Sequence, residues 1–268
     1  MLGRLGFDSA ALDAKLLTGY GLGLDSLAMA TRENETVGAA AALRVAELLQ
    51  RRMTGESVAR IMGEREFYGL AFALNAATLE PRPETELLVD LALAHLAEGA
   101  RLLDLGTGTG CIGISILANM ASASAVATDL SEAALAAAAK NGARHGVTSR
   151  LQLRRGNWFE ALAGDERFDL IVSNPPYIAT GVLDTLSREV RAFDPALALD
   201  GGPDGLAPYR IIAVEAGRRL LPKGRLLVEI GYDQGAAVAD LLTAAGFADV
   251  AVHKDLNGLD RVVSAHQI

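Results

Sequence analysis

The stretch RLLDLGTGTGCIGISILANM, residues 101–120, decides how this chain folds. A short apolar run of strand character meets three glycines at alternate positions, and an apolar run of helical length follows them. Glycine has no Cβ, so the backbone of such a turn can pass close to a ligand. The first turn of the following helix offers free N–H groups to a polar or anionic ligand. The stretch predicts a strand, a glycine-rich binding loop and a helix.

Apolar strands and helical segments alternate on either side of this stretch, through residues 85–268. The further strand candidates are AVATDL (125–130), RLQLRRG (150–156), FDLIVSN (168–174) and GRLLVEIG (224–231). Helical patterns separate them, for example SEAALAAAAKNGARHG at 131–146. This alternation is typical of an α/β domain with a mostly parallel, doubly wound, Rossmann-like sheet. Residues 247–267 predict two closing strands that end the sheet antiparallel.

The first part of the chain has a different pattern. Residues 1–63 have helical spacing and few β-branched residues, which predicts a small bundle of about three or four helices. Residues 64–84 contain aromatic residues around Gly69, which predict a short hairpin. The motif PRPETE at 81–86 follows, and its prolines predict a rigid extended segment. We therefore expect a helical domain at 1–63, a hairpin and proline-rich linker at 64–84, and the α/β domain at 85–268.

Composition narrows the class of protein. The 268 residues are 50% hydrophobic and carry a formal charge of -8. An acidic balance argues against holding nucleic acid through its phosphates, so no stable nucleic-acid binding is expected. The single cysteine, Cys111, excludes an internal disulfide, and we interpret it as a small residue that begins a helix. The four histidines lack metal-ligand spacing, and no apolar run is long enough to span a bilayer. We expect a cytoplasmic, metal-free monomer.

Two further features favour S-adenosyl-L-methionine as the cofactor of the glycine loop. Asp104 precedes the first glycine of Asp104-Leu105-Gly106-Thr107-Gly108-Thr109-Gly110, and this spacing differs from the dinucleotide pattern G-x-G-x-x-G. An acid at that point suits a cationic amino-acid tail better than a pyrophosphate. Asp129 closes the next strand and can accept the two ribose hydroxyls. Asn157 and Trp158 follow the third strand and can hold adenine, with a core tryptophan near a turn as the alternative interpretation.

The sequence Asn174-Pro175-Pro176-Tyr177 ends an apolar strand and predicts the acceptor site. Two prolines stiffen the turn. An amide nitrogen is a poor nucleophile because its lone pair is delocalised into the carbonyl group. The Asn174 side-chain oxygen and the Pro175 carbonyl can each accept one N–H, which orients the nitrogen and raises its electron density. Tyr177 can stack on the planar group and exclude water. The pattern predicts methylation of a planar amide or amino nitrogen without a strong general base.

With these motifs in place, the sequence resembles the peptide chain release factor glutamine methyltransferases of the HemK/PrmC type. GEREFYGLAF at 63–72, PRPETE at 81–86, DLGTGTGCIG at 104–113, SNPPYI at 173–178 and LDRVV at 259–263 carry the resemblance. It implies N5-methylation of the glutamine in the Gly-Gly-Gln motif of bacterial class 1 release factors 1 and 2, in support of translation termination. S-adenosyl-L-homocysteine would be the other product. It also implies that the helical domain recognises the substrate.

The resemblance also assigns residues. Asn174, Pro175 and Tyr177 are expected to be catalytic, with Pro176, Arg82 and Glu84 beside them in substrate binding. The cofactor is expected to contact Asp104, Gly106, Thr107, Gly108, Thr109, Gly110, Asp129, Asn157, Trp158 and Asn174. Three positions depart from the family pattern: Ser57 replaces a proline, Glu80 replaces an isoleucine, and Asn157 stands where an aspartate is common.

Other functions remain open at this point. A glutamine methyltransferase of a ribosomal protein would share the same acceptor site. An N6-adenine nucleic-acid methyltransferase presents similar geometry, but it must extrude its base and needs a basic surface. A non-catalytic binding module is disfavoured because the glycine loop and the acceptor motif are both intact.

Overall fold

The structure, a computed structural model, describes residues 2–268 and divides into two compact units. The first unit runs to Glu64 and also includes Ser187–Phe193, a segment that lies far away in the sequence. The second unit comprises Arg65–Leu186 and Asp194–Ile268. Met1, the first residue of the expected helical domain, lies outside the described residues.

The first unit is helical, as its sequence pattern predicts. Its elements are η1 (Leu2–Leu5), α1 (Ala10–Leu22), α2 (Ser26–Thr31), α3 (Ala39–Met53), α4 (Val58–Met62) and α8 (Arg188–Phe193). Helices α1 and α3 approach closely, since a Cβ on Gly21 would lie 2.7 Å from the Val45 side chain. Arg52 of α3 reaches Asp13 of α1 at 2.7 Å and Glu189 of α8 at 3.2 Å. This buried arginine joins the inserted helix to the unit.

The expected hairpin, formed by β1 (Glu64–Phe67) and β2 (Leu70–Ala73), begins at the boundary between the two units. The two loop residues, Tyr68 and Gly69, have φ values of 53° and 72°. Two consecutive positive φ angles are the mark of the tight turn that best matches the twist of a hairpin. Phe67 and Phe72 of the hairpin are buried and pack edge to face, with ring centroids 6.1 Å apart.

A seven-stranded sheet forms the centre of the second unit. Its strands are β3 (Arg101–Leu105), β4 (Ser124–Asp129), β5 (Leu151–Arg155), β6 (Phe168–Ser173), β7 (Leu220–Glu229), β8 (Ala248–Lys254) and β9 (Asp260–His266). They lie in the order β5-β4-β3-β6-β7-β9-β8. The first five strands are parallel, whereas β9 runs antiparallel to β7 and β8 antiparallel to β9. The predicted mostly parallel sheet with an antiparallel end is confirmed.

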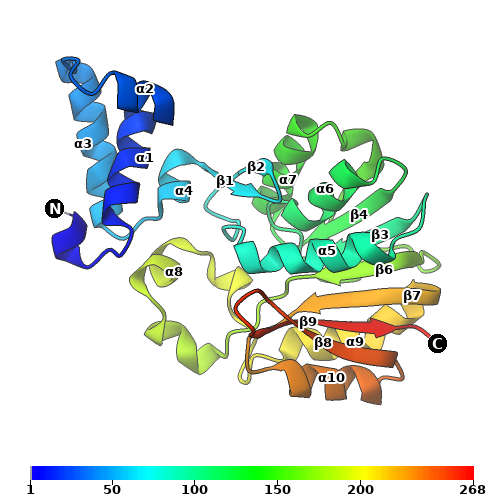
Figure 1. Cartoon of the computed structure of the whole chain (residues 1–268). Helices are drawn as coiled ribbons and strands as arrows, with labels where there is room; N and C mark the ends of the chain where they lie inside the picture. The colour runs from blue at the N-terminus through cyan, green and yellow to red at the C-terminus, as the bar shows by residue number, and fades with distance from the viewer. Residues whose placement is uncertain (1) are drawn as a thin grey trace. The chain divides into compact units, whose positions relative to one another are not determined.

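Helices cover both faces of this sheet (Figure 1). One face packs against α5 (Glu86–His95), α6 (Cys111–Asn119) and α7 (Glu132–Arg144), and the other against α9 (Ala207–Arg219) and α10 (Gly235–Ala244). Successive strand residues point to opposite faces. Accordingly Leu102 belongs to the α5–α6 core, whereas Leu103 and Leu105 belong to the α9–α10 core. Full burial of one such leucine contributes about 1.5–3 kcal/mol.

The short connections complete the unit as the 3-10 helices η2 (Pro83–Thr85), η3 (Thr148–Arg150), η4 (Thr180–Thr185) and η5 (Ala196–Ala198). The chain enters the sheet at β3 and then proceeds outward to β5 before it returns to β6 beside β3. This reversal makes the carboxyl ends of β3 and β6 the topological switch point, where open α/β sheets bind ligands. The glycine loop and Asn174 both begin at that edge.

Candidate active site

The glycine loop that follows β3 has the conformation that its sequence predicts. Gly106, Gly108 and Gly110 have φ values of 69°, 56° and 82°. Residues other than glycine rarely adopt this left-handed region. The Gly106 and Thr107 N–H groups donate to the Thr128 carbonyl at 2.9 and 3.0 Å, so the loop is fastened to the end of β4.

Asp104 supports this loop from inside the protein. Its Oδ2 accepts the Thr107 hydroxyl at 2.6 Å and the Gly113 N–H at 3.2 Å. Oδ1 is buried and has no hydrogen-bond partner within residues 2–268. Burial raises the pKa of the carboxyl group to about 6, against the opposing effect of the hydrogen bond from Thr107. Asp104 lies behind the loop and does not line the cavity described below.

Asp129 at the end of β4 is held in place by backbone donors. Its Oδ2 accepts the Gly108 N–H at 2.9 Å and its Oδ1 accepts the Ser131 N–H at 2.8 Å. Each carboxylate oxygen has a second lone pair, so both can still accept a hydroxyl. Asp129 lines the cavity.

A cavity of about 410 Å³ opens along the carboxyl edge of the sheet. Most of the expected site residues line it: Arg82, Gly106, Thr107, Gly108, Thr109, Asp129, Asn157, Trp158, Asn174 and Pro176. The other expected residues lie outside this lining: Asp104, Gly110, Glu84, Pro175 and Tyr177. The structure thus brings together, at one opening, the residues that follow β3, β4, β5 and β6.

Trp158 combines both interpretations that its sequence position allows, because it lines the cavity and also packs against the α9–α10 core. Its φ of 51° is unusual for a bulky residue and costs on the order of 1–3 kcal/mol. Its carbonyl accepts the Thr128 hydroxyl at 3.1 Å, which ties the loop to β4.

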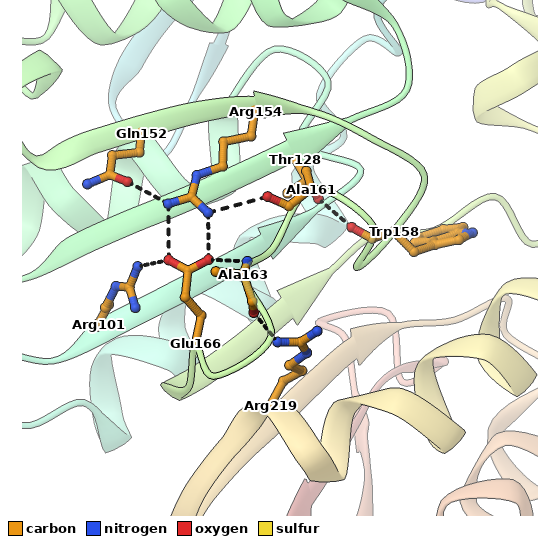
Figure 2. A network of polar contacts seen from close by, with 9 residues as sticks. All are labelled: Arg101, Thr128, Gln152, Arg154, Trp158, Ala161, Ala163, Glu166 and Arg219. Atoms are coloured by element: carbon orange, nitrogen blue, oxygen red, sulfur yellow. Dashed lines mark hydrogen bonds and ion pairs between the residues drawn. The ribbon is translucent and has the colours of Figure 1, made fainter.

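An ion-pair network braces the segment that carries Trp158 (Figure 2). The Glu166 carboxylate accepts from Arg154 of β5 at 2.6 and 3.0 Å and from Arg101 of β3 at 2.5 Å. The same carboxylate accepts the Ala163 N–H at 2.8 Å. The hydrogen bonds from Arg154 are the largest cause that lowers the pKa of Glu166 to about 2. The indole ring of Trp158 points away from this network (Figure 2).

The Asn174–Tyr177 turn is held by carbonyl contacts on its far side. The Tyr177 carbonyl accepts Gln234 Nε2 at 3.0 Å, and the Ile178 carbonyl accepts the Gly201 N–H at 2.8 Å. A Cβ on Gly201 would lie 2.9 Å from the Pro176 carbonyl, so only glycine permits this approach. Among the hydrogen bonds formed within residues 2–268, none ends on Asn174 Oδ1 or on the Pro175 carbonyl. These two acceptors are the ones predicted to hold the substrate amide.

Tyr177 is partly buried and packs against the α9–α10 core. Desolvation is the main cause that raises the pKa of its hydroxyl group to about 12. The side chain is therefore a neutral phenol at physiological pH and cannot act as a base. Cys111 is likewise inert, because burial raises the pKa of its thiol group to about 12.

The PRPETE segment is tied to its surroundings by three side chains. Arg82 pairs with the buried Asp194 at 2.9 Å. Thr85 Oγ1 accepts Asn174 Nδ2 at 3.3 Å. Glu86 Oε1 accepts the N–H of Tyr68 in the hairpin at 2.8 Å.

The three departures from the family pattern are accommodated locally. Ser57 caps α4, since its hydroxyl accepts the Arg60 N–H at 3.1 Å. Glu80 is buried and pairs with Arg65 at 3.4 Å. Asn157 is exposed at the cavity, where it presents a neutral side chain.

Several residues that shape the site are not among the site residues expected from the sequence. Thr85 and Glu229 are each 2% exposed and lie beside Asn174. Asn141 of α7 exchanges hydrogen bonds with Ala73 and donates to the Thr109 carbonyl at 2.9 Å, which joins the hairpin to the glycine loop. Only the glycine-rich stretch DGGPDG at 200–205 offered a hint, because its glycines permit close packing against the acceptor turn.

No helix within residues 2–268 is long and apolar enough to cross a membrane. In the same described part of the chain, no three His, Cys, Asp or Glu side chains gather as a metal site would need.

Comparisons with known proteins place this site in context. Residues 1–63 match the family described as PrmC N-terminal domain, and residues 83–197 match the family described as Methyltransferase small domain. A release factor glutamine methyltransferase from Agrobacterium fabrum is 48% identical over 94% of this chain and 89% of its own length. A protein of the same name from Cereibacter sphaeroides is 49% identical over 98% of this chain and 94% of its own length. The crystal structure of a methyltransferase from Pyrococcus furiosus has a TM-score of 0.56 at 16% identity, covers 84% of this chain and 98% of that chain, and shows the shared fold alone.

Proposed function

The chain belongs to the release factor glutamine methyltransferase family, and from this premise we propose how its own residues methylate a glutamine side chain. The methyl donor is S-adenosyl-L-methionine, and the acceptor is the amide nitrogen, N5, of the glutamine in the Gly-Gly-Gln motif of class 1 release factors. The observation that carries the proposal is a pair of acceptors, Asn174 Oδ1 and the Pro175 carbonyl, which accept no hydrogen bond within residues 2–268 and follow β6 at the switch point beside the glycine loop.

The chemistry of the cavity lining fits the cofactor. The glycine loop has no Cβ groups to obstruct the methionine portion, and Asp129 has carboxylate lone pairs free for the ribose hydroxyls. Trp158 offers an aromatic surface for adenine, and Asn157 offers a polar side chain beside it. When bound, the cofactor supplies a methyl group on a cationic sulfonium that a nitrogen lone pair can attack. Asp104 is proposed to support the loop from behind, with Gly110 starting helix α6.

The acceptor turn orients the substrate amide. Asn174 Oδ1 and the Pro175 carbonyl each accept one N–H of the glutamine NH₂ group, so the nitrogen, and not the oxygen, faces the methyl donor. The two hydrogen bonds also shift electron density onto the nitrogen. Positioning of this kind supplies roughly 7–11 kcal/mol in the best model systems. Tyr177 is proposed to lie against the substrate side chain and, with Pro176, to exclude water, while Arg82 and Glu84 are proposed to shape the entrance.

The proton of the methylated amide leaves without a strong base. Tyr177 stays protonated because its pKa is raised to about 12, and Asn174 has no basic group. The nitrogen becomes acidic once it is methylated, so its proton can be lost to water after the transfer. The residues of this chain therefore act by orientation and by exclusion of solvent.

The first unit is proposed to recognise the substrate protein. Every residue that lines the cavity belongs to the second unit, so the helices of the first unit are left free for another role.

Methyl transfer from radiolabelled S-adenosyl-L-methionine to three acceptors tests the proposal. Purified release factor, intact ribosomes and duplex DNA are offered in parallel to the full chain. We expect label in the release factor alone, located by mass spectrometry on the glutamine of the Gly-Gly-Gln motif. Label on a ribosomal protein or on adenine would point instead to one of the alternative acceptors.

A further inference from the structure

A line of polar side chains leads inward from Asn174. Asn174 Nδ2 donates to Thr85 Oγ1 at 3.3 Å. Glu229, the last residue of β7, lies close enough to Thr85 and Asn174 that both side chains lower the pKa of its carboxyl group. Thr85 and Glu229 are each 2% exposed, so bulk water does not compete for these contacts.

The chemistry of these groups determines which of them donates and which accepts in each hydrogen bond. A carboxylate only accepts hydrogen bonds, and a threonine hydroxyl has a single hydrogen to donate. When Glu229 is ionised, the Thr85 hydroxyl donates to it and is left to accept from Asn174. The NH₂ end of Asn174 therefore points inward, and its Oδ1 is left for the cavity, which Asn174 lines.

We propose that Glu229 and Thr85 are positioning residues that hold the amide of Asn174 with its oxygen toward the substrate glutamine. The inference rests on the proposed function, since it concerns the acceptor that Asn174 provides there. Thr85 lines the cavity, whereas Glu229 does not and acts only by way of Thr85 and Asn174.

The orientation of Asn174 decides which atom of the substrate reacts. The two ends of an asparagine amide have nearly the same shape. If Asn174 turned over, its NH₂ group would face the NH₂ group of the substrate and would favour the substrate oxygen instead. The glutamine would then bind with its carbonyl where its nitrogen must be. When the NH₂ group of Asn174 is held in place, the site therefore presents the nitrogen of the substrate amide, and not its oxygen, for methylation.

Burial of the Glu229 carboxyl group is unfavourable for the stability of the fold. Its Oε2 is buried without a hydrogen-bond partner in the described part of the chain. Desolvation is the largest effect on its carboxyl group and raises the pKa to about 7. Buried polar atoms without partners are rare in folded proteins and call for a reason. The charged or titratable groups that influence Glu229 or are influenced by it are Arg261, Glu84, Tyr177, Tyr209 and Cys111.

Three substitutions and a matched control test the inference in the full chain. Thr85→Val removes the hydroxyl at constant shape, and Thr85→Ser keeps a hydroxyl. Glu229→Gln replaces an acceptor-only carboxylate by an amide that can also donate, so the hydrogen bonds between Glu229, Thr85 and Asn174 can run in the opposite direction. Tyr209→Phe is the control, because its buried hydroxyl donates to the backbone carbonyl of Glu229 at 2.8 Å and not to the carboxyl group. The measurements are single-turnover methyl transfer to release factor and calorimetric affinity for S-adenosyl-L-methionine.

We expect Thr85→Val and Glu229→Gln to slow methyl transfer by about 10- to 100-fold, as does loss of the partners that orient metal ligands. Cofactor affinity should not change, Thr85→Ser should recover most of the rate, and Tyr209→Phe should match the wild type. In an Asn174→Ala background, Thr85→Val should have no further effect, because the line then has nothing to orient. The wild-type kcat/KM should rise with pH across about 7 as Glu229 ionises, and Glu229→Gln should remove this rise.

Each other outcome has a defined meaning. Wild-type rates for Thr85→Val and Glu229→Gln, with Asn174→Ala impaired, overturn the inference and leave the proposed function standing. Additive losses in the double variant, or a parallel loss of cofactor affinity, also overturn it, because both indicate a merely structural role. If Glu229→Gln does not fold, the Thr85→Val and Thr85→Ser pair decides. A wild type that methylates no glutamine refutes the proposed function itself.

Discussion

Replacement of Glu229 by Gln is expected to change how the stability of this protein depends on pH. The carboxyl group titrates at 4.5 when exposed, and burial raises its pKa to about 7 in the folded protein. Between these two values the folded state holds a proton that the unfolded state has released, so stability falls as pH rises. The stabilising contribution is complete below pH 4.5 and is lost as pH rises through 7. The whole difference amounts to about 3 kcal/mol.

The stability difference is best measured at pH values above the isoelectric point of about 5.1, because the protein tends to associate near that pH. From pH 6 to pH 8 the wild type should lose about 1 kcal/mol that Glu229→Gln does not lose. Asp104 also has a raised pKa, but it is present in both proteins and its effect cancels in the difference.

Urea unfolding at pH 6, 7 and 8, followed by circular dichroism, measures the difference between the two proteins. Because the chain has two units, hydrogen exchange of the β7 amides should accompany it, so that unfolding of the second unit is followed by itself. Tyr209→Phe is the control and should keep the wild-type dependence on pH. If the stability difference between wild type and Glu229→Gln is the same at all three pH values, the carboxyl group of Glu229 is not buried as described.

Three other substitutions test separate parts of the structure. Asp129→Ala is expected to weaken S-adenosyl-L-methionine binding by about 1.5–3 kcal/mol, and unchanged affinity in calorimetry would refute the ribose assignment. Arg52→Ala leaves the Asp13 carboxylate buried without its 2.7 Å partner and should destabilise the first unit by about 3–5 kcal/mol. Hydrogen exchange that stays as slow as in the wild type in α1 and α3 would contradict this. Glu166→Gln loosens the brace in Figure 2 and should increase acrylamide quenching of Trp158, the only tryptophan; equal quenching would show that the brace does not order that segment.

The order of elements in the second unit could be predicted from the sequence because each signal is local. The run RLLDL, the alternate glycines of the loop and the Asn174-Pro-Pro turn each determine the conformation of their own few residues. Alternation of strands and helices then leaves few ways to assemble a parallel sheet. The antiparallel end at β8 and β9 could be predicted for the same reason, since a polar turn joins two strands that are close in sequence.

The contacts that depend on distant residues could not be predicted. Thr85 and Asn174 are 89 positions apart, and Glu229 lies on a third segment. Nothing in the pattern VEIG distinguishes a buried carboxylate near Asn174 from one that faces solvent. The inclusion of α8 in the first unit depends on Arg52 and Glu189, 137 positions apart. The sequence suggests Asp104 as a cofactor contact, but it gives no sign that the Asp104 carboxylate accepts the Thr107 hydroxyl and lies outside the cavity lining.

Single-turnover methyl transfer by Asn174 variants tests the central claim most directly. Wild type, Asn174→Ala and Asn174→Asp are compared with release factor as substrate and S-adenosyl-L-methionine saturating. Asn174→Ala removes one of the two acceptors and should lower the rate by about 10²-fold or more. Asn174→Asp keeps an acceptor but places a second carboxylate beside Glu229, so its rate should fall between those of alanine and wild type. If Asn174→Ala transfers methyl groups as fast as the wild type, Asn174 does not orient the amide and the account is contradicted.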